Sequence, residues 1–149
     1  MQAQMLAPAA VLVLWSLIML YWMAATRFPA LSKYRADAPK PRPGIRGQDL
    51  DGALPDKVMW KSHNFTHLME QPTIFYPTVI ILAIMGATAT DVLLAWVYVA
   101  IRIVHSFWQA LVNTVRVRIL LFLISTIALT VLAVRAVLAT LMFDPGVAP

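Results

Sequence analysis

Apolar and polar residues alternate along the chain in long blocks. Four blocks are predominantly apolar, and the second becomes strongly so only from Leu68. The blocks cover about residues 6–26, 59–86, 91–112 and 117–142. Because a helix needs about 20 apolar residues to cross the hydrocarbon core of a bilayer, each block is long enough to span a membrane. The pattern predicts four transmembrane helices.

The segments between the blocks differ in length. The first, residues 27–58, is rich in Pro, Gly and charge and lacks helical periodicity, so we expect an ordered or semi-ordered loop there and no helix. The other two connections are short, which forces neighbouring helices to be antiparallel. We therefore predict an all-α membrane protein whose residues 1–149 form one domain, an up-down four-helix bundle. Its second helix should kink at Pro72 and Pro77.

The composition supports this class of protein. The chain is 60% hydrophobic and only 13% charged, whereas soluble domains are about 45–50% apolar and about 25% charged. The net charge of +5 does not indicate a nucleic-acid partner, because the basic residues are not interleaved with aromatic ones. Cys is absent, which excludes a disulfide framework and a thiolate metal site.

Lys and Arg lie on one side of the predicted bundle. The first loop contains Arg27, Lys33, Arg35, Lys40, Arg42, Arg46 and Lys57. Arg116 and Arg118 stand at the junction of the third and fourth helices, which an up-down bundle places on the same side, whereas both termini and the other turn have neither residue type. The positive-inside rule therefore predicts a cytoplasmic loop and termini on the non-cytoplasmic side. We expect the first span to be retained, because no positive region precedes it.

Three polar side chains form a stripe on the third predicted helix. Arg102, His105 and Gln109 stand at i, i+3 and i+7, on one face over about two turns. A charge inside a membrane span costs about 2.5–3.5 kcal/mol on insertion scales. These groups are therefore expected to face the bundle interior or a wet cavity.

The second predicted helix carries a similar stripe. His63, His67 and Glu70 stand at i, i+4 and i+7, and Asn64 is adjacent to the first of them. Both stripes fall at the cytoplasmic ends of their helices. We therefore expect the two stripes to meet in one cavity on the cytoplasmic side.

Arginines at two further helix ends lie at the same level. Arg27 ends the first helix and Arg118 begins the fourth. If they join the cavity, its excess of cations favours an anionic ligand, since a guanidinium group binds carboxylates and phosphates through paired hydrogen bonds. Alternatively, both anchor their helices by snorkelling, and Arg102 pairs with Glu70 to hold two helices together. We interpret Arg135, near the outer face, as an interface anchor.

The same residues also resemble a set of metal ligands. His63, His67 and Glu70 have a suitable spacing on a helix, and His105 is a candidate fourth ligand. The surrounding arginines would repel a cation, and three histidines are few for a membrane di-iron enzyme. We therefore predict no metal site.

Several of these residues resemble motifs of a known family. Arg102-Ile-Val-His105 resembles the third-helix Arg-x-x-His of prostaglandin E synthase, and Arg118 then falls where that enzyme has its catalytic arginine. Arg27 matches the arginine that ends the first helix, and NFTHLMEQP resembles the second-helix Asn/Glu/Pro signature. Over essentially its whole length the chain resembles the MAPEG superfamily, the membrane-associated proteins in eicosanoid and glutathione metabolism. It is similar to a divergent bacterial-type branch, for which we expect an inner-membrane location.

This resemblance implies a homotrimer that binds glutathione as co-substrate between subunits, near the cytoplasmic side. Arg118 would be the catalytic residue that stabilises the glutathione thiolate or polarises the second substrate, because a nearby fixed cation lowers the pKa of a thiol below its free value of about 8.5. Arg27, Arg102 and His105 would hold the carboxylates or support the groups that do.

The remaining binding roles fall on the second stripe. Glu70, together with Asn64 or His67, would receive the amino and amide groups of glutathione. His63 and Gln109 complete the candidate binding residues, because they share the two polar faces.

The sequence also departs from the family pattern. Asn64 stands six residues before Glu70, and His67 occupies the register of the signature asparagine. Lys61 and His63 stand where arginines are expected, and Arg116 is a rival for the catalytic position. Gln109 and Phe122 replace two tyrosines.

Two hypotheses follow from these matches and departures. The first is a glutathione transferase or peroxidase that acts on lipophilic substrates entering from the bilayer. The second is a non-catalytic membrane protein that uses the same bundle to bind lipid or a partner protein. The matching arginines favour the enzyme, and the missing tyrosines favour the binding protein.

Overall fold

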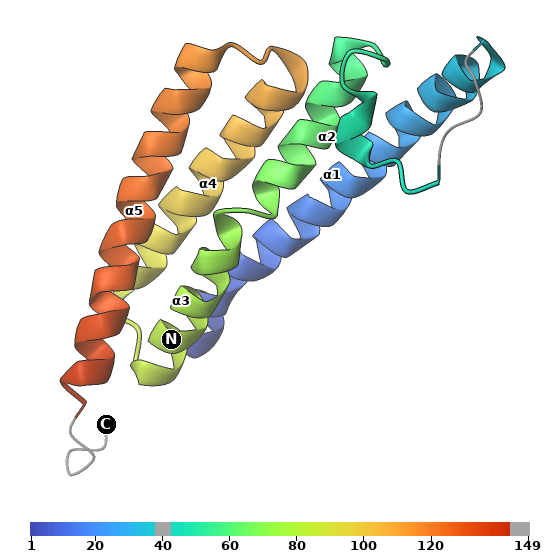
Figure 1. Ribbon diagram of the computed structural model, residues 1–149. Helices are drawn as coiled ribbons and strands as arrows, with labels where there is room; N and C mark the ends of the chain where they lie inside the picture. The colour runs from blue at the N-terminus through green and yellow to red at the C-terminus, as the bar shows by residue number, and fades with distance from the viewer. Residues whose placement is uncertain (38–42, 144–149) are drawn as a thin grey trace.

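Five α-helices and a short 3₁₀ helix make up the computed structural model, which describes residues 1–37 and 43–143 (Figure 1). The elements are α1 (Gln2–Asp37), η1 (Gly47–Leu50), α2 (Asp56–Leu68), α3 (Pro72–Met85), α4 (Ala89–Leu111) and α5 (Val115–Leu141). Four segments are long and apolar enough to cross a membrane: α1, α2 together with α3, α4, and α5. The predicted all-α, four-span architecture is confirmed.

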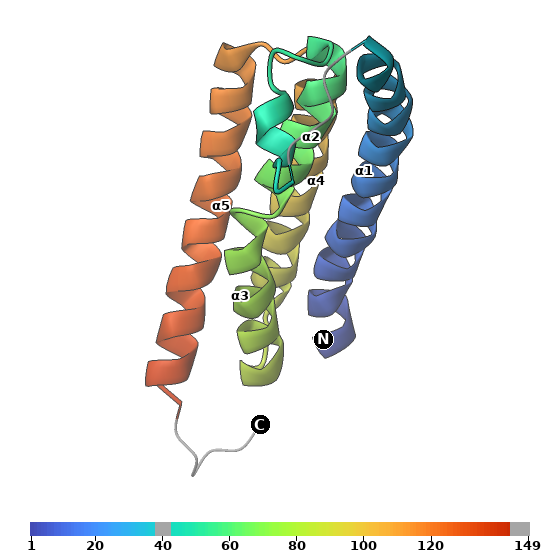
Figure 2. The ribbon, with the colours of Figure 1, turned by 45° about the vertical axis from the view of Figure 1, so that its right-hand side comes forward.

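Successive spans run in opposite directions (Figures 1 and 2). The start of α1, the α3–α4 turn and the end of α5 lie together at what we call the terminal end. The end of α1, the start of α2 and the α4–α5 turn lie together at the opposite, loop end. Helix α1 packs against α2, α3 and α4, while α5 packs against α3 and α4. This arrangement is the expected up-down bundle.

Only a narrow stripe of α1 is buried in the chain. Met5, Leu12 and Met19 are spaced seven residues apart and are completely buried. Leu14 and Tyr21, each two residues after a buried one, are exposed. A spacing of seven keeps these residues on one helix face. The remaining apolar surface of α1 is therefore available to lipid or to another protein.

The second span is interrupted between α2 and α3. Pro72 has no N–H to donate to the carbonyl of Leu68, so the α-helical ladder cannot continue through this point. The chain instead makes a tight turn in which the N–H of Thr73 donates to the carbonyl of Glu70 at 3.2 Å. The interruption predicted at Pro72 is confirmed, whereas α3 continues through Pro77.

The prediction of a loop without helix over residues 27–58 is wrong for its first part, and η1 and the first residues of α2 also lie within that range. Helix α1 continues to Asp37 and includes Pro29. The reason is tertiary: Ala30 and Leu31 pack against a small buried cluster that the sequence pattern does not reveal. The cluster consists of Leu50, Leu54 and Met59. Lys40 and Arg42, which entered the orientation argument, lie outside the described residues.

Candidate functional site

A polar cavity of about 440 Å³ lies at the loop end. We call it the loop-end pocket. Its lining residues come mainly from η1, the residue after η1, α2 and the α2–α3 break. Helices α4 and α5 contribute one residue each. Five predicted site residues line it: His63, His67, Glu70, Gln109 and Arg118. The volume falls within the range of about 300–1,000 Å³ that is usual for small-molecule sites.

The polar stripe of α4 faces the bundle interior, as predicted. Arg102 is fully buried, and His105 and Gln109 are each 2% exposed. The Nη2 of Arg102 donates to the carbonyl of His67 at 3.0 Å. Within the described residues, Nε and Nη1 of Arg102 and Oε1 of Gln109 are buried without a hydrogen-bond partner. Arg102 thus contacts the backbone of α2, and the alternative in which it pairs with Glu70 is not found.

Glu70 pairs instead with His67. Their Nδ1 and Oε2 atoms are 2.9 Å apart, and the break after Leu68 turns the Glu70 side chain out of the α2 helix. The imidazole ring of His67 lies between two other rings, with centroid distances of 5.0 Å to His105 and 5.5 Å to Phe122. Helices α4 and α5 therefore fix the orientation of His67 at the edge of the pocket.

Asn64 is buried behind the pocket and does not line it. Its Nδ2 donates to the hydroxyl oxygen of Ser106 at 2.7 Å, and that oxygen also accepts from Nε1 of Trp15 at 3.0 Å. Asn64 therefore ties α2 to α4 and α1. Sequence reasoning missed Ser106 and Trp15. The only available signal was that Ser106 follows Arg102 by four residues, on the same helix face.

Arg118 enters the pocket from the first turn of α5. Its Nη1 donates to Oδ1 of Asn113 at 2.8 Å, and its Nε is buried without a partner in the described part of the chain. Asn113 has a left-handed backbone conformation, with φ of 59°, which Asn adopts more readily than most residues. Arg116 is exposed and does not line the pocket. Of these two arginines, Arg118 lines the loop-end pocket and Arg116 does not.

Arg27 and His63 hold η1 and the residue that follows it near the pocket. Arg27 donates to the hydroxyl of Ser62 at 3.1 Å and to the carbonyl of Gly47 at 2.8 Å. His63 contacts Asp51 at 2.8 Å. Gly47 allows the guanidinium group to approach, because a Cβ at this position would lie 2.8 Å from Nη2 of Arg27. Arg27 does not itself line the loop-end pocket.

The sequence matches the MAPEG family over residues 5–138, nearly the whole chain. The chain belongs to the MAPEG family. The match includes all four spans and the residues of the loop-end pocket. Together, the family and the four apolar segments identify an integral, multi-pass membrane protein. No curated protein and no solved structure matches the chain.

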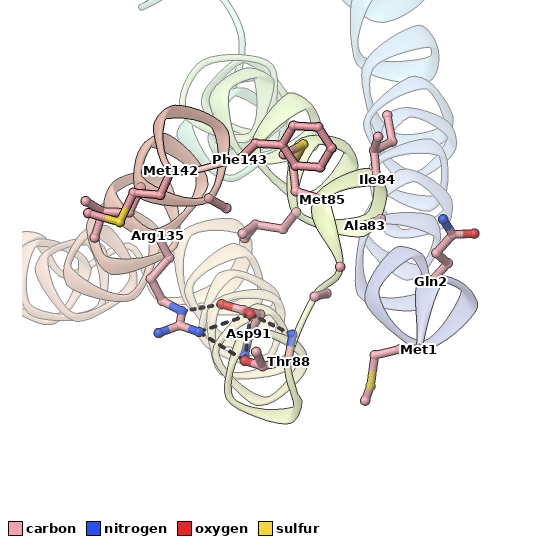
Figure 3. Close-up of a pocket in the computed structure, with 15 residues that line it drawn as sticks. Met1, Gln2, Ala83, Ile84, Met85, Thr88, Asp91, Arg135, Met142 and Phe143 are labelled. Atoms are coloured by element: carbon pink, nitrogen blue, oxygen red, sulfur yellow. Dashed lines mark hydrogen bonds and ion pairs between the residues drawn. The ribbon is translucent and has the colours of Figure 1, made fainter. Parts of the chain in front are cut away.

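This MAPEG chain has a second, larger cavity of about 850 Å³ at the terminal end (Figure 3). Three of its polar side chains, those of Thr88, Asp91 and Arg135, are joined by the dashed lines in the figure. Asp91 accepts from the backbone N–H of Thr88 at 2.8 Å and caps α4. Arg135 donates to Asp91 from two nitrogens and to the Thr88 hydroxyl. The predicted anchor Arg135 is thus an ion-pair partner that joins α5 to the start of α4.

The histidines of the MAPEG chain do not form a metal-binding cluster in the region described. Among residues 1–37 and 43–143, no three His, Asp or Glu side chains are grouped so that they could hold a metal ion. His63 and His67 instead contact different carboxylates, those of Asp51 and Glu70.

Proposed function

We propose that this MAPEG protein is a glutathione-dependent transferase or peroxidase that acts on lipophilic substrates from the bilayer. The observation that carries the proposal is the presence of cationic and amide groups with unused hydrogen-bonding capacity in and behind the loop-end pocket. Glutathione supplies the complementary chemistry: two carboxylates, an ammonium group, two amides and a thiol. Pockets that combine a few convergent polar groups with buried unsatisfied atoms are the usual places for ligand binding.

Arg118 is the proposed catalytic residue. Its guanidinium group is fixed by Asn113, so it is already oriented when the thiol arrives, and little reorganisation is needed to stabilise the thiolate. The buried Nε has no partner among the described residues, and the Arg118 side chain lines the pocket, so its guanidinium group can contact a ligand there. A fixed cation in a partly buried position stabilises a thiolate relative to the thiol.

Binding residues surround Arg118 in this proposal. One oxygen of Glu70 is occupied by His67, and the other is available to the ligand's ammonium group. Gln109 offers a buried carbonyl oxygen, and Arg102 and His105 form the buried polar layer behind it. Arg27, His63 and Asn64 act indirectly, because their contacts fix η1 and α2 around the pocket.

The assembly and orientation belong to the same proposal. The apolar faces that α1 and α5 leave exposed support a homotrimer, and the one-sided Lys and Arg distribution supports termini on the non-cytoplasmic side. Native mass spectrometry from detergent should give a trimer, and a monomer at every concentration would contradict it. A C-terminal reporter that functions only in the cytoplasm should be inactive, and its activity would contradict the orientation.

The experiment that tests the activity is turnover of a generic lipophilic electrophile, and of a lipid hydroperoxide, by the purified protein. We expect glutathione to be consumed in step with product, and S-methylglutathione, which keeps the binding groups but has no free thiol, to inhibit without reacting. A protein that gives no thiol-dependent product with either substrate would contradict the proposal. That result would support the non-catalytic lipid- or partner-binding hypothesis, which the replacement of two tyrosines by Gln109 and Phe122 favours.

A further inference from the structure

A histidine and a carboxylate are paired at the edge of the loop-end pocket. The Nδ1 of His67 lies 2.9 Å from Oε2 of Glu70. An ionised carboxylate only accepts hydrogen bonds, so this contact places the ring proton on Nδ1 and leaves the Nε2 lone pair free. The His67 side chain is 21% exposed and lines the pocket, so a bound ligand can approach its ring.

The surroundings of His67 restrict its movement. Its ring lies between His105 of α4 and Phe122 of α5, and its backbone carbonyl accepts from Arg102. The charged and titratable groups facing it are Glu70 at the α2–α3 break, Arg102 and His105 on α4, Arg118 on α5, and Asp51 and His63 across the pocket. A nucleophile is usually activated by a neighbouring base, and a third group holds that base in position.

The other two histidines lack this combination of features. His63 uses Nε2 to contact Asp51, so its outer nitrogen is occupied. His105 is 2% exposed and is enclosed behind His67. Of the three histidines in the chain, His67 alone lines the pocket with an oriented ring whose Nε2 makes no hydrogen bond to the described residues.

We propose that His67 is the general base that removes the thiol proton of glutathione, and that Glu70 is its positioning residue. This inference rests on the proposed function and adds a second participant beside Arg118. The S–H bond breaks, its proton moves to Nε2, and the electron pair stays on sulfur as a thiolate stabilised by Arg118. The thiolate forms a C–S bond with an electrophile such as 1-chloro-2,4-dinitrobenzene, chloride leaves with the electron pair of the C–Cl bond, and His67 returns its proton to water.

The test compares pH profiles of kcat and KM for the wild type, His67→Gln and Glu70→Gln in the full-length protein. Because general-base catalysis contributes about 10²–10⁴-fold, we expect His67→Gln to lower kcat about 100-fold at pH 7, while KM for glutathione changes by less than about threefold. The loss should shrink to less than about tenfold near pH 9, where thiols of ordinary pKa ionise unaided. Glu70→Gln should reproduce the pH-dependent loss of kcat and also raise KM, because its second oxygen serves the ligand.

His63→Gln is the matched control, since it removes the other histidine–carboxylate pair of the same pocket. It should alter KM and leave the shape of the pH profile of kcat unchanged. His67→Ala adds a test that packing alone cannot mimic: added imidazole should restore turnover, and pyrazole, which has nearly the same shape but is a far weaker base, should not.

Three outcomes would overturn the role of His67: a His67→Gln loss that is equal at all pH values, a loss confined to KM, or equal effects of imidazole and pyrazole. Failure of the proposed function is seen separately, because the wild type itself would then consume no thiol.

Discussion

Each end of the bundle contains buried or half-buried arginine, but the two ends satisfy it differently. At the terminal end, Arg135 donates to the carboxylate of Asp91 and to the hydroxyl of Thr88 (Figure 3). At the loop end, Arg102 donates to a backbone carbonyl and Arg118 to an amide oxygen. Both keep buried nitrogens without a partner in the described residues. An arginine within a membrane helix is thus not a functional signal by itself; the completeness of its hydrogen bonding is what separates the two sites.

This difference in hydrogen bonding matters energetically because a buried charge without partners is costly. Groups that leave water must recover hydrogen bonds elsewhere, and an ionised group without them is strongly unfavourable. The Asp91–Arg135 pair recovers them within the chain and therefore stabilises the fold. Arg102 and Arg118 recover them incompletely, and of the two only Arg118 lines the loop-end pocket, where an anionic ligand would pair with it.

The largest expected effect is that of Arg118→Ala. Glutathione-dependent kcat should fall by about 10²–10³-fold, as for loss of one donor to a developing anion, and glutathione affinity should change little. Steady-state kinetics and isothermal titration would measure the two quantities. Arg116→Ala is the control and should retain activity, because Arg116 is exposed outside the pocket. If only Arg116→Ala loses turnover, the catalytic register is wrong by two residues.

Arg102→Met should affect ligand binding more than the stability of the ligand-free protein. Arg102 does not line the pocket, so its charge acts on the bound carboxylates through space, and loss of about 1 kcal/mol of this attraction should weaken glutathione affinity several-fold. Replacing an incompletely paired buried charge by an apolar side chain of similar size is often neutral or stabilising. Thermal denaturation without glutathione should therefore show no loss. A large drop in the midpoint would show that Arg102 is satisfied within the protein.

Arg135→Leu should have the opposite pattern. It leaves the Asp91 carboxylate buried with only the Thr88 contacts, which should cost about 1–3 kcal/mol of unfolding free energy. Glutathione affinity should stay at the wild-type value, because the loop-end pocket is unchanged. Arg135→Lys is the matched control and should recover part of the stability. Weakened glutathione binding in a still folded Arg135→Leu protein would remove the distinction between the two ends.

The smallest effect is expected for Gly47→Ala. The added Cβ would meet the Nη2 of Arg27 at 2.8 Å, and the flexible end of that side chain can move away. We expect less than about 1 kcal/mol of change in stability and a small rise in KM for glutathione, because the η1 segment loses one contact to α1. Gly52→Ala is the comparison, because its Cβ would meet nothing within 4 Å. Its effect comes from backbone strain at a positive φ, whereas that of Gly47→Ala comes from the contact with Arg27.

The sequence predicted those features that depend on helical spacing. Arg102, His105 and Gln109 share a face because of the helical repeat, and the same repeat places His63 and His67 beside the pocket. It could not predict contacts set by the angle and depth of helix packing. The Ser106 bridge to Trp15, 91 residues away in the chain, and the pairing of Asp91 with Arg135 are of this kind.

Local patterns also misjudged one segment for the same reason. Residues after Arg27 look like a loop because they contain Pro and many charges, yet Leu31 packs against Leu50 and Leu54, so the helix is retained. Likewise, the alternative in which Arg102 pairs with Glu70 depends on helix packing, which charge alone does not reveal. In the structure Glu70 pairs with His67.

The most direct test of the account is the ionisation state of glutathione bound to the purified protein. Glutathione would be titrated into the protein near pH 7, below the usual thiol pKa of about 8.5, while the ultraviolet absorbance of the thiolate is followed. We predict that the thiolate absorbance of the wild type rises to saturation as glutathione is added. In Arg118→Ala it should not rise, even when calorimetry shows that glutathione binds. Glutathione that binds to the wild type entirely as the thiol, or does not bind at all, would contradict the assignment of the loop-end pocket.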